Sequence, residues 1–130
     1  MGLEVGRSLE MEWTVDATNT ANAIGNPGMH VLATPWLIAY FEIACHRLLE
    51  PELTPGQATV GTAISIEHLA ASPIGMRFTV RAEITDIDRR RVLFAVVAHD
   101  LRERIGEGTH ERFIVESDQF QERVGRKLGG

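Results

Sequence analysis

The sequence predicts an α+β fold in which one antiparallel sheet of about five strands wraps around one long central helix. Three observations lead to this prediction. Residues 33–49 (ATPWLIAYFEIACHRLL) form an apolar segment long enough for about four helical turns. Five other segments have the polar–apolar alternation or the β-branched residues that are typical of strands. The last four of them follow one another with short turns between them, which favours antiparallel pairing.

Length and composition predict one domain spanning residues 1–130. The chain is 44% hydrophobic and carries a net charge of −5, which argues against nucleic acid as a partner because phosphate binding needs a basic face. The N-terminal residues MGLEVGRSLE lack the apolar stretch of a signal peptide, and no apolar run approaches the ~20 residues that span a bilayer. The only cysteine, Cys45, is expected to be a small core residue, and a reducing, cytoplasmic setting is expected.

The first strand is expected at Leu9–Val15, where polar and apolar residues alternate. Residues 16–32 are rich in Asn, Thr, Ala and Gly and are expected to form a loop with room for a short turn of helix. A loop of this length in a small domain is often functional, for example as a lid over a site.

The long helix is expected to begin at Thr34 and to end at about Leu49. Thr can cap a helix and Pro35 suits its first turn, whereas Pro51 interrupts the pattern after the end. Because this helix is apolar on nearly every side, it should be covered by other structure. Glu42 is the exception, since a buried carboxylate is costly unless it has partners.

Four strands are expected after the helix, at Gln57–Leu69, Gly75–Ile87, Val92–Leu101 and Gly106–Val115. In the second of them one face is apolar and the other is polar, as in a sheet with one wet side. The polar end of the chain, Glu116–Gly130, is expected to be a short helix. A sheet curled around one helix is the hotdog arrangement, and its open edges make dimerisation the default expectation.

Alternation along the strand after the helix predicts which side chains point inward. Counting by twos, His68 ends an inward-facing row that begins with Val60, Thr62, Ile64 and Ile66. Thr34 and Glu42 are eight residues apart and share one helical stripe, about 12 Å apart along the axis. His68 could reach either of them. The spacing alone leaves other readings open, namely a simple N-cap, a Glu that is solvated or paired with Arg47 or another base, and a core histidine.

Three segments, VLATPWLIAYFEIACHRLL, GTAISIEHLAASPIGMRFTVRAEI and IGEGTHERFIV, resemble the fluoroacetyl-CoA thioesterase family of hotdog proteins. The resemblance covers roughly Val5–Val115, and GTAI..EH.AASP.G and GTHER are its most specific motifs. In that family a Thr at the helix start, a Glu two turns later and a His on the following strand form the catalytic set. The resemblance therefore implies that the catalytic residues are Thr34, Glu42 and His68.

The family also uses a Gly before this His and an Arg in the last strand near the bound thioester, and these match Gly61 and Arg112. In the THER motif, strand alternation places His110 and Arg112 on one face and Glu111 on the other. The alternative reading of this motif is an ion pair that holds the last strand in place.

The segment before Thr34 departs from the family. The fluoroacetyl-specific proteins carry aromatic residues in this lid, whereas this chain reads NPGMHVLAT, with Gly28, Met29 and His30. The departure argues against selectivity for fluoroacetyl-CoA and favours a different short or medium acyl chain.

The implied activity is the hydrolysis of an acyl-CoA thioester to the free acid and CoA. His68 would act as general base or acid, and Glu42 would either orient the imidazole or attack the acyl carbon itself. No cofactor or metal is expected, since the five histidines show no ligand spacing. Acyl-CoA is the expected partner, together with a second copy of the chain or a higher oligomer, and residues 89–91 (Arg-Arg-Arg) are candidates for phosphate contacts.

Two rival functions remain at this stage. One is a hotdog acyl-CoA hydratase, for which His99 and Asp100 are the only adjacent His–Asp pair, although neighbouring strand residues face opposite sides. The other is a non-catalytic protein that binds acyl-CoA or another small ligand, in which Glu42 and His68 are structural. Tight binding of acyl-CoA without release of thiol would favour the second rival.

Overall fold

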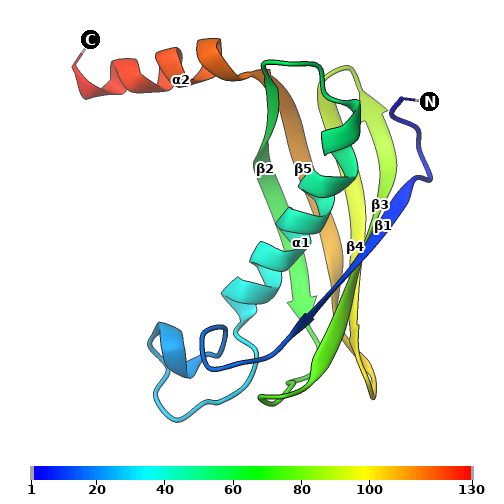
Figure 1. Ribbon diagram of the computed structural model, residues 1–130, viewed down its shortest axis with the longest axis vertical. Coiled ribbons are helices and arrows are strands. Elements are labelled where there is room, and N and C mark those ends of the chain that lie inside the picture. The colour runs from blue at the N-terminus through cyan, green and yellow to red at the C-terminus, as the bar shows by residue number, and fades with distance from the viewer. Residues whose placement is uncertain (1, 130) are drawn as a thin grey trace.

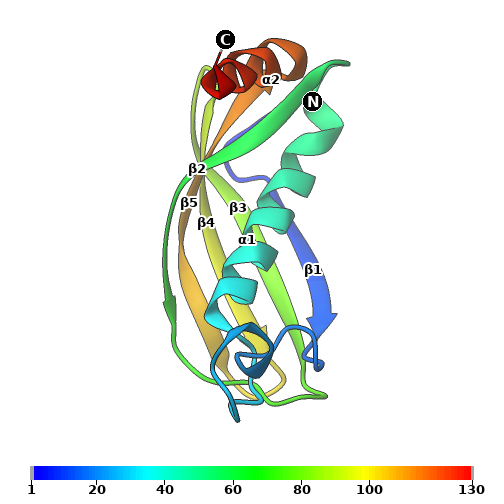
Figure 2. The ribbon, with the colours of Figure 1, turned by 90° about the vertical axis from the view of Figure 1, so that its left-hand side faces the viewer.

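The computed structural model describes residues 2–129 and consists of one curved sheet with a long helix against one of its faces (Figures 1 and 2). The sheet has the strand order β1-β3-β4-β5-β2, and all neighbouring strands are antiparallel. β1 and β2 are therefore the two edges. The elements are β1 (Ser8–Thr14), η1 (Asn22–Ile24), α1 (Thr34–Leu49), η2 (Glu50–Glu52), β2 (Gln57–His68), β3 (Arg77–Asp88), β4 (Arg91–Asp100), β5 (Arg104–Glu116), α2 (Ser117–Gly125) and η3 (Arg126–Leu128).

The predicted elements are all present, and α1 has the expected bounds. The expected alternation along β3 is confirmed, because its apolar side chains are buried beneath α1 while Arg77 and its polar neighbours are not. The expected loop after β1 contains one short helical turn, η1. Among residues 2–129, no helix is both long and apolar enough to cross a membrane. The core consists of side chains from α1 and from the inner sheet face, including Leu37, Phe41, Leu49, Phe78, Ile84 and Phe94.

The sheet covers one side of α1, whereas the sequence predicts that it covers nearly the whole circumference. Pro35, Ile43 and Arg47 are exposed on the opposite side, and 37% of Ile43 is accessible. The physical reason is the width of the sheet. Five neighbouring strands span about 19 Å, whereas the circumference of a helix with its side chains is about 30 Å. The apolar residues of this open face are therefore not explained by packing within one chain.

The inward row predicted for β2 is correct only for its second half. The pairing of β2 with β5 shifts register between Gly61 and Ala63, which is the mark of a β-bulge. The extra residue reverses the alternation, so that Thr59 is buried whereas Thr62 is exposed and donates a hydrogen bond to Glu111 on the outer face. Placing Val60 and Thr62 on the inward face is therefore wrong. Beyond the bulge, the inward residues are Ile64, Ile66 and His68, as predicted.

Candidate active site

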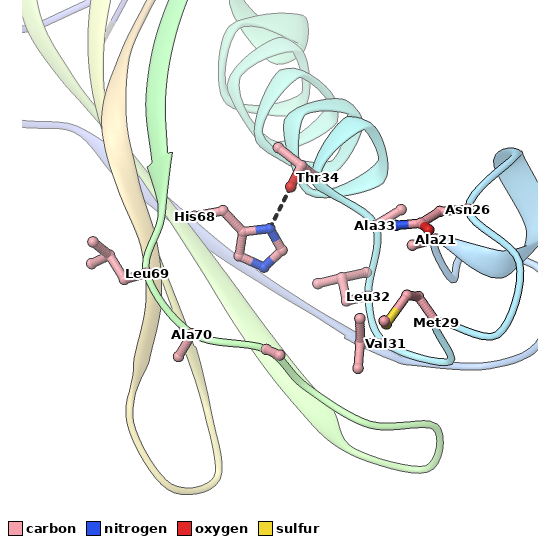
Figure 3. A pocket seen from close by; sticks show the side chains of 11 residues that line it. Ala21, Asn26, Met29, Val31, Leu32, Ala33, Thr34, His68, Leu69 and Ala70 are labelled. Atoms are coloured by element: carbon pink, nitrogen blue, oxygen red, sulfur yellow. Dashed lines mark hydrogen bonds between the residues drawn. The ribbon is translucent and has the colours of Figure 1, made fainter.

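Thr34 and His68 meet where the first turn of α1 passes the end of β2 (Figure 3). The Thr34 hydroxyl lies 2.7 Å from Nδ1 of His68. The residue before the helix is Ala33, and no side chain caps this helix end. The reading of Thr34 as a simple N-cap is therefore wrong, because Thr34 is already helical and its hydroxyl contacts the imidazole instead.

The surroundings of His68 keep its imidazole neutral. Burial is the main cause that lowers the pKa of His68 below its ordinary value of 6.5, and the backbone of Ala70 opposes this shift. A neutral ring has one N–H and one acceptor nitrogen. With the hydrogen on Nε2, Nδ1 accepts the Thr34 hydroxyl proton, as general base chemistry requires. Nε2 itself is buried and has no hydrogen-bond partner among residues 2–129.

A pocket of about 400 Å³ opens beside this pair, and most of its lining is apolar. One wall comes from the loop that contains η1, where Met29 is 52% exposed. The base of this loop is fixed by Asn19, whose side-chain amide donates to the hydroxyl of Tyr40 at 2.9 Å. The loop between β1 and α1 is therefore part of the pocket, as Figure 3 shows for Asn26 and Met29.

Glu42 lies two turns further along α1 and has different partners. Its Oε2 is 3.7 Å from Nη1 of Arg112 and 3.9 Å from Nε2 of His110, both on β5. The Glu42 side chain is 43% exposed and lines a second pocket, of about 370 Å³, with Arg112. The base that pairs with Glu42 is therefore Arg112 and not Arg47.

The guanidinium of Arg112 is held on three sides inside the protein. Its Nε donates to the hydroxyl of Thr59 at 2.9 Å, and Nη2 donates to the Thr59 carbonyl at 3.1 Å. Nη1 lies 3.2 Å from Nε2 of His110. Burial lowers the pKa of Arg112, and the Glu42 carboxylate opposes that shift. Because an arginine pKa begins so high, the guanidinium stays charged at neutral pH.

Gly61 leaves the space that the Glu42 carboxylate occupies. A Cβ at Gly61 would stand 2.5 Å from Oε2 of Glu42 and 3.3 Å from Nη1 of Arg112. Any larger residue would therefore displace the carboxylate. Gly61 also pairs with Arg112 across the ladder between β2 and β5, so the two residues predicted near the thioester lie together.

The structure thus brings the five predicted site residues together in two separate groups. Thr34 and His68 form one, and Glu42, Gly61 and Arg112 form the other. Among residues 2–129, no polar contact joins Glu42 to His68, so Glu42 does not orient this imidazole within one chain. Each group reaches the open face of α1, since Thr34 is exposed and Glu42 shares its pocket with Ile43 and Arg47.

Sequence reasoning found His110 beside the second group but missed two other side chains there. The alternation predicted for the THER motif is confirmed, because His110 and Arg112 are buried while Glu111 faces outward and accepts from Arg91 at 2.6 Å. The ion-pair reading therefore applies to Glu111. The remaining side chains, Thr59 and His46, carry no distinctive motif, yet His46 Nδ1 lies 2.6 Å from the Thr59 hydroxyl.

Other reactive residues lie outside both groups. Cys45 is buried, and burial raises its thiol pKa to about 12, so it is a core residue. His99 is exposed, whereas Asp100 accepts from the backbone of Arg102 at 2.8 Å, so the two do not act as a pair. Among residues 2–129, no cluster of three or more His, Cys, Asp or Glu residues could hold a metal ion.

Comparison with known proteins gives consistent results. The model of the fluoroacetyl-CoA-specific thioesterase family matches residues 15–118. The fluoroacetyl-CoA thioesterase of Streptantibioticus cattleyicolor is 41% identical over 97 residues, which are 75% of this chain and 70% of that protein. A solved structure of fluoroacetyl-CoA thioesterase FlK superposes with a TM-score of 0.91 at 34% identity, covering 98% of both chains.

Two further solved structures extend the comparison. A mutant of FlK in complex with fluoroacetate and CoA has a TM-score of 0.87 at 35% identity, covering 91% of this chain and 99% of that one. A hot-dog-like protein from Thermanaerovibrio acidaminovorans has a TM-score of 0.90 at 22% identity, covering 97% and 93%, and shows the fold alone. Because the family model and a 41% identical relative both match its sequence, this hotdog-fold chain belongs to the family of fluoroacetyl-CoA-specific thioesterases.

Proposed function

We propose that this protein hydrolyses a short or medium acyl-CoA thioester to the free acid and CoA, with Thr34, Glu42 and His68 as its catalytic residues. The observation that carries the proposal is the 2.7 Å contact between the Thr34 hydroxyl and Nδ1 of His68 beside a largely apolar pocket. Membership of a thioesterase family supports the reaction type. A relative solved with CoA supports CoA as the carrier of the acyl group.

In the proposed mechanism, His68 begins neutral and accepts the proton that a water molecule loses when it attacks an acyl carbon. Attack forms a bond to the acyl carbon, the carbon–sulfur bond breaks, and the CoA thiolate takes up the proton that His68 received. Backbone N–H groups in the first turn of α1 have no intrahelical partner and can stabilise the negative charge that develops on the carbonyl oxygen. Glu42 has one of two roles. It activates the water that attacks the thioester, or its carboxylate attacks first and forms an acyl anhydride as the CoA thiolate leaves. In the second case water then hydrolyses the anhydride, which restores Glu42, and its proton passes through His68 to the thiolate.

We further propose that the protein is a homodimer in which the two groups come from different copies. Glu42 and His68 have no contact within one chain, and both groups line the open face of α1. The strand that carries Gly61 and His68, β2, is a sheet edge, and an edge strand has unpaired backbone groups on one side, which favours pairing with a second copy. The Glu42 carboxylate of one copy would then face the Thr34–His68 pair of the other.

The acyl group is proposed to be other than fluoroacetyl. The loop before α1 contains Gly25 and Gly28, with φ of 111° and 86°, and a Cβ at either position would meet nothing within 4 Å. This part of the loop therefore places no aromatic ring over the pocket. Apolar side chains such as Met29 and Leu69 line it instead and suit an aliphatic chain.

The three arginines at positions 89–91, which the sequence offers as phosphate ligands, already pair with carboxylates. Arg89, Arg90 and Arg91 each lie within 4.0 Å of a carboxylate, on Asp88, Glu116 and Glu111 respectively. These pairings hold the hairpin and reduce its net positive charge. A cytoplasmic location is proposed as well, supported by the single, buried cysteine.

The test is release of free thiol from a panel of acyl-CoAs, namely acetyl through decanoyl, phenylacetyl and fluoroacetyl. Wild type is compared with His68→Ala, with His99→Ala as the control because His99 is an exposed histidine of β4. We expect turnover in wild type and in the control, and a loss of about 100-fold or more in His68→Ala. Acyl-CoA binding without any thiol release would overturn the proposal in favour of a binding protein.

A further inference from the structure

His110 is a buried histidine beside the candidate site to which the proposed reaction gives no role. It is 2% exposed, and its ring stacks on Phe94 with the centroids 6.1 Å apart. Its Nδ1 lies 2.7 Å from the carbonyl oxygen of Ala63 on β2. A carbonyl oxygen can only accept a hydrogen bond, so Nδ1 must carry the hydrogen.

This hydrogen bond determines what the other ring nitrogen can do. In a neutral imidazole with hydrogen on Nδ1, Nε2 is an acceptor. The donor that it meets is Nη1 of Arg112, at 3.2 Å. Burial is the main cause that lowers the pKa of His110, and the positive charge of Arg112 acts in the same direction. The hydrogen bond to the Ala63 carbonyl and the carboxylates of Glu42 and Glu111 oppose the shift without cancelling it. The ring is therefore neutral when Arg112 donates to it.

The geometry of Arg112 then follows from its partners. Its guanidinium is planar and carries five N–H groups in fixed directions. Three of them are directed at the Thr59 hydroxyl, the Thr59 carbonyl and His110. With these three directions fixed, the second N–H of Nη1 cannot turn freely. The nearest carboxylate oxygen to Nη1 is Oε2 of Glu42, at 3.7 Å.

We infer that His110 is a positioning residue, whose neutral imidazole accepts a hydrogen bond from Arg112 and so fixes the guanidinium that faces Glu42. The inference rests on the proposed function in one respect, namely that Glu42 takes part in thioester hydrolysis. His110 is not among the residues that line the pocket beside His68. Its Nε2 lies 3.9 Å from Oε2 of Glu42, which is beyond hydrogen-bond distance, and as an acceptor it has no hydrogen to give to the carboxylate. Its effect on the reaction is therefore transmitted through Arg112 to the position of the Glu42 carboxylate.

Two substitutions distinguish the donor role of Nδ1 in His110 from the acceptor role of Nε2. His110→Asn keeps an amide N–H that can reach the Ala63 carbonyl, but it has no acceptor where Nε2 stands. His110→Gln is longer, and its amide oxygen can stand near Nε2 and accept from Arg112. His99→Asn, at an exposed position on β4, is the control for a histidine substitution in the sheet. Thermal melting of all variants checks that each is folded.

The first readout is the NMR signal of the Arg112 guanidinium. In wild type, restricted rotation should give resolved and slowly exchanging Nη hydrogens. His110→Asn should broaden or lose them, and His110→Gln should retain them. This readout needs no enzymatic activity, so it decides whether His110 fixes Arg112 even if no thioester is hydrolysed. Unchanged Arg112 signals in His110→Asn would overturn the inference.

The second readout is steady-state kinetics on the best acyl-CoA. We expect kcat to fall about tenfold in His110→Asn with KM nearly unchanged, because only the placement of a reacting group has changed. His110→Gln should recover most of the loss. Equal losses in the two variants, or a wild-type kcat in His110→Asn, would overturn the inference. An inactive wild type would instead remove the proposed function and leave the NMR result to stand alone.

Discussion

The two polar groups on the open face of α1 are built in opposite ways. At the start of the helix, Thr34 and His68 share one short hydrogen bond, and the second ring nitrogen of His68 has no partner among residues 2–129. Two turns later, Arg112 and His110 form four hydrogen bonds with each other and with β2. The first group is loosely held beside a pocket, and the second is firmly held inside the sheet.

This difference corresponds to two different tasks. A base must change its protonation state and its hydrogen bonds during the reaction, so an incompletely bonded histidine suits it. A charge that is needed in one place is best held by groups that do not move. The contrast supports the proposed roles, in which His68 transfers the proton and Arg112 keeps the Glu42 carboxylate in position.

The strongest test of the comparison asks whether the two groups must come from one chain. Glu42→Gln and His68→Ala should each lose about 100-fold or more in thiol release. A mixed dimer of the two variants would contain one intact site if each site combines groups from two copies. Co-expression with two affinity tags should then recover about a quarter of wild-type activity, since half of the dimers are mixed and each has one working site.

The control for this experiment is the double variant Glu42→Gln/His68→Ala co-expressed with wild type. If each site combines groups from two copies, both sites of this mixed dimer contain one substituted residue and neither is intact. If both groups come from one chain, the wild-type chain keeps an intact site. Absence of recovery in the first mixture, with mixed dimers demonstrated by the two tags, would place both groups in the same chain and contradict the shared site.

A smaller effect is expected from the glycine that makes room for Glu42. Gly61→Ala introduces a Cβ 2.5 Å from Oε2 of Glu42, so the carboxylate must move while the strand can stay. We expect kcat to fall about tenfold to a hundredfold with little change in melting temperature. Gly125→Ala is the matched control, because a Cβ there meets nothing within 4 Å. A wild-type kcat in Gly61→Ala would show that the position of the carboxylate is not critical.

The two histidines should also make stability depend on pH. Burial lowers the pKa of both His68 and His110 in the folded protein below the ordinary 6.5. Below pH 6.5 the unfolded chain therefore binds more protons than the folded one, and the free energy of unfolding falls as the pH falls from 6.5 towards the folded pKa values.

Urea titrations at about pH 7.5 and about pH 5.5 measure this loss of stability, at a fixed protein concentration. His110→Gln should lose less stability on acidification than wild type, because one of the two contributing groups is gone. The carboxylates with lowered pKa, such as Asp100 and Glu111, do not interfere because their ordinary values are 3.8 and 4.5. The same loss in both proteins would mean that His110 does not stay neutral in the folded state.

Much of this architecture can be predicted from the sequence because it follows from local patterns. The Thr34–Pro35 start and the break before Pro51 locate α1, and alternation locates the strands to within two residues at each end. The bulge in β2 could not be foreseen, because Gly61, Thr62 and Ala63 are compatible with either a regular strand or an irregular one. The misplacement of Thr62 follows from that single inserted residue.

The candidate site shows the same limit. Resemblance to the family selected the five site residues Thr34, Glu42, Gly61, His68 and Arg112. The structure adds their positions and their contacts with one another. The sequence pattern did not predict that Glu42 and His68 lie apart, because it places Glu42 on the helical stripe of Thr34 and His68 on the inward face of the next strand. Their separation depends on where β2 ends relative to α1, which is a tertiary property. His110 was visible in its motif, but its hydrogen bonds to Ala63 and Arg112 were not.

The smallest effect is expected on the outer face of the same motif, where Glu111 provides a contrast to His110 next to it. Glu111 accepts hydrogen bonds from Thr62 at 2.7 Å and Arg91 at 2.6 Å, which join β5 to both of its neighbours at the sheet surface. Ion pairs at the protein surface contribute little, so Glu111→Gln should lower the melting temperature slightly and leave kcat unchanged. Thiol release and thermal melting measure the two quantities side by side with His110→Asn. A loss of kcat in Glu111→Gln as large as that in His110→Asn would mean that the motif acts through the strand as a whole, and the distinction between its two faces would fail.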